Sequence, residues 1–272
     1  MSRWITEEDA GYGAIETWET EALLSLMHEE DKKAVEAVGK VIPHIARFVE
    51  ALIPRLEKGG RLIYVGAGTS GRLGVLDAAE CLPTFGTTQV IGLIAGEEAA
   101  LRAPVEAAED NEQAAVEALQ AIHLSEKDAV FGISASGRTP YVLAAMRYAR
   151  QQGALTGAFT ANPSTPLESL VEYPIVVLTG PEIVTGSTRL KAGTATKLVL
   201  NMISTAAFAR LGKVRGGRMI DLQLVNQKLW QRAIRYLREA APLSEEEARA
   251  LLEEAGSLRV ALDKALKAHG KG

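Results

Sequence analysis

The chain has 272 residues, of which 47% are hydrophobic, so it can form one large domain, or one domain with a small appendage. Its formal net charge of −4 argues against a nucleic-acid partner, and its four scattered histidines suggest no metal site. The single cysteine, Cys81, excludes an intrachain disulfide, and the lack of a signal-like apolar core or an apolar run of 18 residues leads us to expect a soluble cytoplasmic protein.

Two helices are predicted before the first strand. The first covers residues 16–27, and the second covers 31–58, where apolar side chains recur every three or four positions and form one face. Pro43 is expected to kink the second helix. Because its apolar face precedes any strand, we expect this helix to pack outside the sheet or against a second subunit. Residues 1–58 are assigned to an N-terminal helical segment.

Strands and helices alternate between residues 59 and 217, which is typical of a parallel sheet covered on both faces. Short apolar runs predict strands at 61–65, 88–94, 129–133, 155–159 and 174–178. The first strand is followed by a helical pattern that ends at Glu80, and further helical patterns cover 97–122, 140–151 and 187–211. Ligands of such sheets bind beyond the carboxyl ends of the strands, so the turns at those ends are the candidate sites.

The remaining residues, 218–272, read as a small helical extension. Helices are predicted over 222–238 and over 258–267. A further helix between them is predicted to begin at a capping box, Ser244-Glu-Glu-Glu247.

The turn after the first predicted strand, Gly66-Ala-Gly-Thr-Ser-Gly71, has the features of an anion site. Glycines interrupt the strand and a helix follows, so backbone N–H groups and the helix dipole point into the turn. The spacing also fits the dinucleotide fingerprint, and an ordinary structural turn can carry the same glycines. A dinucleotide site requires an acidic residue at the end of the next strand, and Glu97 and Glu98 come rather late, which counts against that alternative.

Two further turns follow the same pattern. In Ser134-Ala-Ser-Gly-Arg-Thr-Pro140, Thr139 suits an N-cap and Pro140 the first helical position, while the third turn, Thr185–Lys191, opens the long helix. Ordinary capping explains any one of these turns. The three together place cations in first helical turns, where each costs about 0.3–1 kcal/mol against the dipole unless an anion is bound. These cations are Arg72, Arg138, Arg189 and Lys191.

These motifs resemble those of the N-acetylmuramic acid 6-phosphate etherases. The matching runs are Gly66–Gly74 with Asp77-Ala-Ala-Glu-Cys81, Ala135–Val142, and Gly186–Thr194 with Lys197–Met202, in the same order. The resemblance implies a sugar isomerase (SIS) fold, an α/β fold with a five-stranded parallel sheet flanked by helices. It implies a homodimer that needs no metal or cofactor. It also implies cleavage of the D-lactyl ether of MurNAc 6-phosphate to GlcNAc 6-phosphate and D-lactate during cell-wall recycling.

The resemblance carries two glutamates over as catalytic residues. Glu80 stands in the Asp-Ala-x-Glu-Cys motif, and Glu109 precedes Asp110 as the family's second glutamate does. Glu80 is expected to protonate the leaving lactate oxygen and activate water, and Glu109 to remove the C2 proton. Without the resemblance, the sequence predicts that both carboxylates are solvated surface groups. The expected phosphosugar-binding residues are Gly68, Thr69, Ser70, Gly71, Ser134, Ser136, Gly137, Thr139, Ser187 and Lys191.

The chain departs from the family pattern at several positions, among them Ala10, Glu19, His28 and Val225, and it has Glu97 where a second glycine is usual. Two other functions remain open: a phosphosugar isomerase with the same domain, and a non-catalytic phosphosugar sensor like the glucokinase regulatory proteins. A sensor has no need of both Glu80 and Glu109, so their joint presence favours an enzyme.

Overall fold

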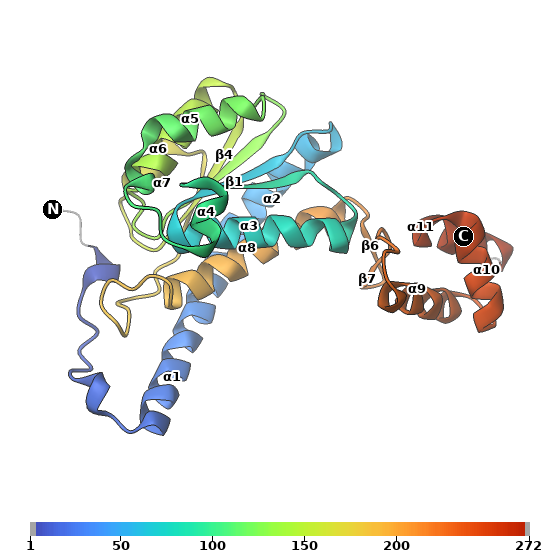
Figure 1. Ribbon diagram of the computed structural model, residues 1–272, viewed down its shortest axis with the longest axis horizontal. Helices are drawn as coiled ribbons and strands as arrows, with labels where there is room; N and C mark the ends of the chain where they lie inside the picture. Colours follow the sequence, from blue (N-terminus) through green and yellow to red (C-terminus); the bar gives the residue numbers. More distant parts are fainter. Residues whose placement is uncertain (1–3, 270–272) are drawn as a thin grey trace. The chain divides into compact units, whose positions relative to one another are not determined.

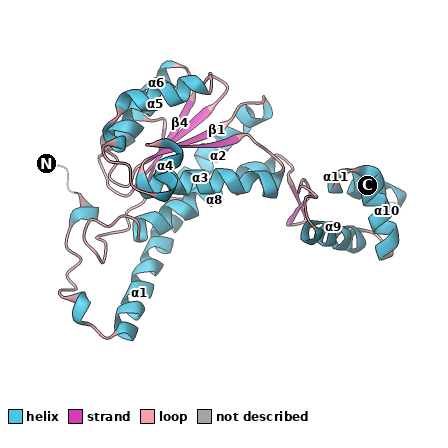
Figure 2. Ribbon diagram, in the orientation of Figure 1, coloured by secondary structure: helices cyan, strands magenta, loops and turns pink. Residues whose placement is uncertain are grey.

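The computed structural model describes residues 4–269, which divide into two compact units. The first comprises the residues up to 79 together with 89–207, and the second comprises 80–88 together with the residues from 208 onward. Figures 1 and 2 show the helices and strands of each unit. The domain bounds expected from the sequence, at 58/59 and 217/218, stay predictions. No helix within residues 4–269 combines the length and apolar character needed to cross a membrane.

The first unit is organised around a five-stranded parallel sheet in the order β2-β1-β3-β4-β5. Its strands are β1 (Leu62–Gly66), β2 (Val90–Ile94), β3 (Ala129–Ile133), β4 (Leu155–Thr160) and β5 (Tyr173–Val176). The register pairs Gly66 with both Ile94 and Ile133, so β2, β1 and β3 end level with one another. This architecture confirms the predicted fold class, and each strand begins and ends close to its predicted bounds.

Helices cover both faces of the sheet, which explains why β1, β3 and β4 are buried throughout. On one face Ile63 and Val65 join a core formed with α5 (Glu112–Ala121), α6 (Pro140–Gln151) and α7 (Pro166–Leu170). On the other face the Tyr64 hydroxyl donates to Asp77 of α3 (Gly68–Phe85). The long helix α8 (Lys191–Arg210) packs there as well, through its contacts with Asp77.

The N-terminal region differs from the prediction of one kinked helix over 31–58. The structure has two helices, α1 (Thr20–Gly39) and α2 (Ile42–Glu57), with Pro43 in the first turn of α2, where a missing N–H costs nothing. The apolar face of α2 lies on the sheet, and the Phe48 ring centroid is 5.0 Å from that of Phe131. That face is therefore not left for a second subunit. Two short 3₁₀ helices, Ile5–Glu7 and Ile15–Thr17, precede α1.

The predicted helix over 97–122 is also wrong as a single element. The structure has α4 (Glu97–Arg102), a 3₁₀ helix η3 (Ala108–Asp110) and then α5. The Asn111 side chain accepts from the Ala114 N–H, which gives α5 its own start. In addition, α8 begins at Lys191 and not at Ser187, and α7 was not predicted.

The second unit has its own core of helices. A hairpin of β6 (Val214–Arg215) and β7 (Arg218–Met219) precedes α9 (Gln227–Ala240), α10 (Glu245–Ala255) and α11 (Leu258–Ala268). Ile234, Leu237 and Leu252 are buried between these helices. The predicted capping box of α10 is confirmed, with Ser244 and Glu247 bonded reciprocally. The hairpin was not predicted.

Candidate active site

Three loops define the candidate site: the first loop (residues 66–71), the second loop (134–139) and the third loop (185–191). The first two follow β1 and β3, which are neighbours that end level, so these loops lie side by side at one edge of the sheet. The third loop joins them through the start of α8, since a methyl group built on Gly193 would lie 3.6 Å from Thr69 Cγ2. The structure thus brings the predicted binding loops together.

The first loop turns tightly from β1 into α3. A methyl group on Gly66 would lie 2.6 Å from the Gly71 nitrogen, so only glycine allows the chain to double back at this point. As α3 begins at Gly68, the N–H groups of Gly68, Thr69 and Ser70 belong to its first turn and have no acceptor within the helix. This geometry suits an anion.

The second loop gathers three hydroxyl groups. Ser134 Oγ lies 3.2 Å from Ser136 Oγ and 3.0 Å from Thr139 Oγ1, and it accepts the Gly137 N–H. Thr139 occupies the N-cap position of α6, as predicted, but its hydroxyl bonds Ser134 instead of capping the helix. Gly137 has φ +66°, and a Cβ there would lie 2.5 Å from Thr165, which makes glycine necessary.

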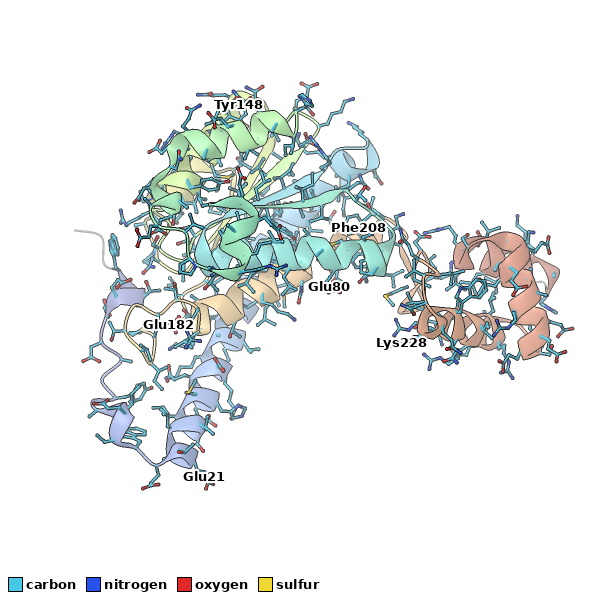
Figure 3. All side chains as sticks on the ribbon, in the orientation of Figure 1. Glu21, Glu80, Tyr148, Glu182, Phe208 and Lys228 are labelled. Atoms are coloured by element: carbon cyan, nitrogen blue, oxygen red, sulfur yellow. The ribbon has the colours of Figure 1, made fainter. Side chains whose placement is uncertain are left out.

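The third loop differs from the expectation. Ser187 and Arg189 precede α8, and the positive end of that helix is occupied by Glu182, a residue that the sequence did not single out (Figure 3). The fully buried Glu182 carboxylate accepts the N–H groups of Lys191 and Ala192, each at 3.0 Å. Burial raises the pKa of Glu182, although these two hydrogen bonds oppose the rise. A carboxylate of the chain itself therefore already neutralises this helix start.

Lys191 is tied to α1 and does not reach out toward the loops. Its side chain is 3% exposed, and its ammonium group pairs with Glu30, which also accepts from Lys33 and the Tyr12 hydroxyl. Burial acts against ionisation of Glu30, but the three donors outweigh it and lower the pKa of Glu30 to about 2.

Two other cations of the loops also contact the protein itself. Arg72 donates to the Leu101 carbonyl at 3.3 Å, and the Arg138 guanidinium lies 4.9 Å from the centre of the Trp4 ring. Arg72, Arg138 and Lys191 thus each have a partner within the protein, so their positions do not by themselves indicate a bound anion.

The two candidate catalytic glutamates are both exposed, and they lie in different units. Glu109 is in η3, between α4 and α5, and Glu80 is near the end of α3 (Figure 3). Glu80 follows Ser70 by ten residues of one helix, which separates them by about 15 Å along its axis.

Behind the first loop, α3 is fixed by a buried polar cluster around Asp77. The Asp77 carboxylate accepts from Tyr64 Oη at 2.9 Å, Asn201 Nδ2 at 2.6 Å and Ser204 Oγ at 3.2 Å. It thereby links β1, α3 and α8. The resemblance included Asp77 in a motif but gave it no role.

A cavity of about 390 Å³, here named the β2 cavity, opens beyond the carboxyl end of β2. Tyr141 and Glu97 are among its polar lining residues. Burial and the nearby charge of Glu97 raise the pKa of Tyr141 to about 12. Glu97 has φ +56°, a left-handed conformation that a residue with a side chain rarely adopts. Glu97 departs from the family pattern, and Tyr141 lies in the matching run Ala135–Val142, where the resemblance gave it no role.

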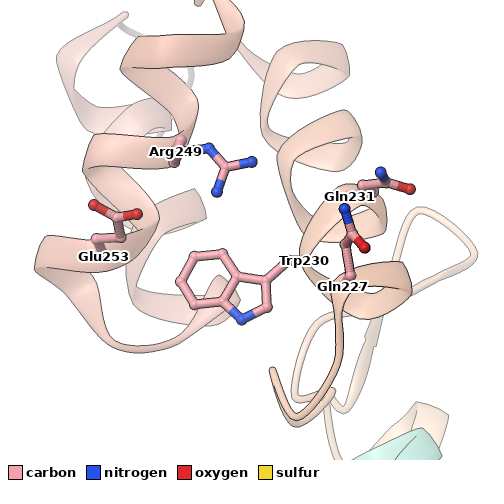
Figure 4. Close-up of a pocket in the computed structure, with 5 residues that line it drawn as sticks. All are labelled: Gln227, Trp230, Gln231, Arg249 and Glu253. Carbon is pink, nitrogen blue, oxygen red and sulfur yellow. The ribbon is translucent and has the colours of Figure 1, made fainter.

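A smaller cavity, of about 230 Å³, lies in the second unit between α9 and α10 (Figure 4). Its lining residues are Gln227, Trp230, Gln231, Arg249 and Glu253. The Trp230 indole N–H donates to the Leu224 carbonyl, so it is already satisfied. This cavity has no glycine-hydroxyl loop. Within residues 4–269, no group of three or more His, Cys, Asp and Glu side chains is placed to hold a metal ion.

The sequence matches two family descriptions that together span most of the first unit. Residues 44–150 match the glucokinase regulatory protein N-terminal SIS domain, and residues 101–206 match the SIS domain. Solved structures with this fold include a protein from E. coli CFT073, with a TM-score of 0.54 and 18% identity, covering 74% of this chain and 97% of that one. A phosphoheptose isomerase from Francisella tularensis has a TM-score of 0.54 and 16% identity, and the match covers 71% of this chain and 100% of that one. These likenesses confirm the SIS fold.

Much closer sequence relatives carry one common name, N-acetylmuramic acid 6-phosphate etherase. The protein of that name from Porphyromonas gingivalis is 52% identical over 263 residues, 96% of each chain. The one from Christiangramia forsetii is 52% identical over 260 residues, 95% of each chain, and the one from Bacteroides thetaiotaomicron is 50% identical over 261 residues, 95% of this chain and 94% of that one.

Proposed function

The chain belongs to the N-acetylmuramic acid 6-phosphate etherase family, and from this we propose that it cleaves the D-lactyl ether of MurNAc 6-phosphate to GlcNAc 6-phosphate and D-lactate. This is a carbon–oxygen lyase reaction that serves amino-sugar and peptidoglycan recycling. The observation that carries the proposal is identity of about half over nearly the whole chain to relatives of that name. The assay that tests it is release of D-lactate from MurNAc 6-phosphate.

The 6-phosphate is assigned to the first and second loops. The supporting features are the first-turn N–H groups of Gly68, Thr69 and Ser70, the close turn at Gly71, and the three hydroxyls around Ser134. The third loop contributes Ser187, and Lys191 contributes by fixing the start of α8 beside Thr69. Unphosphorylated MurNAc should therefore bind far more weakly than MurNAc 6-phosphate in calorimetry, and equal affinities would contradict this assignment.

Two carboxylates suffice for the chemistry. Ring opening exposes the C1 aldehyde and acidifies the C2 proton, which Glu109 removes as the C2–C3 double bond forms. The C3–oxygen bond breaks, and Glu80 supplies the proton that leaves with lactate. Water then adds to the unsaturated aldehyde, its oxygen to C3 and a proton to C2, with Glu80 as the base that activates it. One glutamate must be protonated while the other is ionised.

Glu80→Gln retains the size of the side chain but cannot exchange a proton, so lactate release should fall about 10²–10⁴-fold while phosphosugar binding persists. Glu117→Gln, an exposed carboxylate on α5, is the matched control and should leave the rate unchanged. In deuterated solvent Glu80→Gln should still exchange the C2 hydrogen, and Glu109→Gln should not. The opposite exchange pattern would mean that the two roles are reversed.

A homodimer is part of the proposal, and in it Glu80 and Glu109 of one site come from different copies. Apolar side chains of α1 are available for such an assembly, because Leu24 is 59% and Val35 is 55% exposed. We include a cytoplasmic location, in keeping with the single cysteine.

Mixing two inactive variants tests this arrangement. In a mixed dimer of Glu80→Gln and Glu109→Gln chains, one of the two sites has both glutamates intact if they come from different copies, so lactate release should return. No recovery after subunit exchange, or a monomer mass in light scattering at micromolar concentration, would contradict it. The lactate assay also separates the remaining functions, since neither a phosphosugar isomerase nor a sensor releases lactate.

A further inference from the structure

Tyr141 brings a hydroxyl group to the wall of the β2 cavity. Tyr141 is 3% exposed and lines the cavity, yet its hydroxyl has no hydrogen-bond partner among residues 4–269. A hydroxyl group that lines a cavity and makes no hydrogen bond within the protein can bond water or a ligand there. The Tyr141 hydroxyl is thus a donor available to whatever occupies the cavity.

Glu97 supplies an acceptor in the same cavity. It lines the cavity together with Tyr141, and its negative charge contributes to the raised pKa of the Tyr141 hydroxyl. Its backbone has φ +56°, a strained conformation that persists only where the surroundings impose it. The rest of the wall is largely apolar: Ile94, Val105, Ala107, Ala108, Ala114 and Ala118. Glu106 and Asn111 line the cavity as well, so beside this polar part it offers the Tyr141 hydroxyl as a donor, Glu97 as an anionic acceptor and a stretch of methyl groups.

We propose that the β2 cavity binds the 2-acetamido group of the substrate, with the Tyr141 hydroxyl donating to its carbonyl oxygen and Glu97 accepting its N–H. An acetamido group has one acceptor, one donor and a methyl group, which match these three features. The volume of about 390 Å³ leaves room for the adjoining carbons of the sugar. Tyr141 and Glu97 then act as specificity-determining residues.

The position of the β2 cavity relative to the loops fits this assignment, which rests on the proposed function. Tyr141 follows the second loop by two residues. Ile94 lies against the first loop, because a methyl group on Gly71 would be 2.6 Å from Ile94 Cγ1. Ala107 and Ala108 directly precede Glu109, the group assigned to the C2 proton. The acetamido group is carried by C2, so it belongs between the phosphate loops and this glutamate.

Binding of two non-reacting sugars tests the inference without turnover. Calorimetry would compare GlcNAc 6-phosphate with glucose 6-phosphate, which has a hydroxyl in place of the acetamido group. The wild-type chain should prefer GlcNAc 6-phosphate. Tyr141→Phe should weaken GlcNAc 6-phosphate binding about tenfold and leave glucose 6-phosphate unchanged, as expected for one buried hydrogen bond. Glu97→Gly, which suits the backbone, should also reduce the preference. Tyr148→Phe, on the same helix but outside the cavity, is the matched control.

Each result has a defined consequence. Equal affinity of the wild-type chain for both sugars overturns the inference. An unchanged preference in Tyr141→Phe, or an equal loss of affinity for both sugars in that variant, also overturns it. With MurNAc 6-phosphate, Tyr141→Phe should raise KM with little change in kcat. If the wild-type chain releases no lactate but retains a preference that depends on Tyr141, the proposed function fails and the acetamido site stands.

Discussion

Replacing Glu30 by glutamine should expose how strongly the first unit depends on the pair of Glu30 and Lys191. Both side chains are buried, with exposed fractions of 4% and 3%, and they join α1 to the first turn of α8. Glu30→Gln removes the negative charge and leaves the Lys191 ammonium buried without it. Breaking a buried pair from one side costs about 3–5 kcal/mol, so this loss in the free energy of unfolding is expected at pH 7.

The pH dependence gives a second estimate of the same quantity. The pKa of Glu30 falls from 4.5 to about 2 on folding, which corresponds to about 3 kcal/mol of stability. Because the folded pKa is the lower one, this stability is present above pH 4.5 and is lost as the pH falls toward 2. The wild-type chain and Glu30→Gln should therefore differ most near neutral pH and converge near pH 2.

Urea unfolding followed by circular dichroism at several pH values measures both effects. Glu29→Gln is the matched control, because Glu29 neighbours Glu30 but is 63% exposed in its pair with Lys32, so its loss should change the free energy of unfolding little. A loss below 1 kcal/mol for Glu30→Gln at pH 7, or a difference from wild type that does not shrink between pH 4.5 and 2, would refute the reasoning.

Two further substitutions test other buried features. Asp77→Ala takes the acceptor from Tyr64, Asn201 and Ser204 and should lower the free energy of unfolding by about 2–4 kcal/mol; an unchanged urea midpoint would show that α3 is held in another way. Glu97→Gly should raise the free energy of unfolding by about 1 kcal/mol, because glycine adopts φ +56° without strain; a lower midpoint would mean that the Glu97 side chain stabilises the fold.

The sequence by itself predicted the features that depend on local chemistry. Alternation of apolar strands and helical patterns predicted the parallel sheet, and the strands lie close to their expected bounds. The glycines and hydroxyls of the first and second loops were visible as motifs, because a tight strand-to-helix turn needs glycine at defined positions. The capping box at Ser244 was visible for the same reason, since both of its partners lie within one turn.

The tertiary structure decided which charged groups meet. Glu30 and Lys191 are 161 residues apart, and their pairing occupies a cation that the sequence suggested for binding an anion. Glu182 precedes α8 by nine residues, and only the path of the third loop brings it onto the helix start. The apolar face of α2 was readable as a face, but periodicity does not say what covers it. Tyr141 and Glu97 likewise share a cavity only because α6 packs against α5 and η3, which complete its wall. Spacing along a chain encodes partners within a few residues, whereas partners far apart are set by how helices pack on a sheet, and no local pattern records that packing.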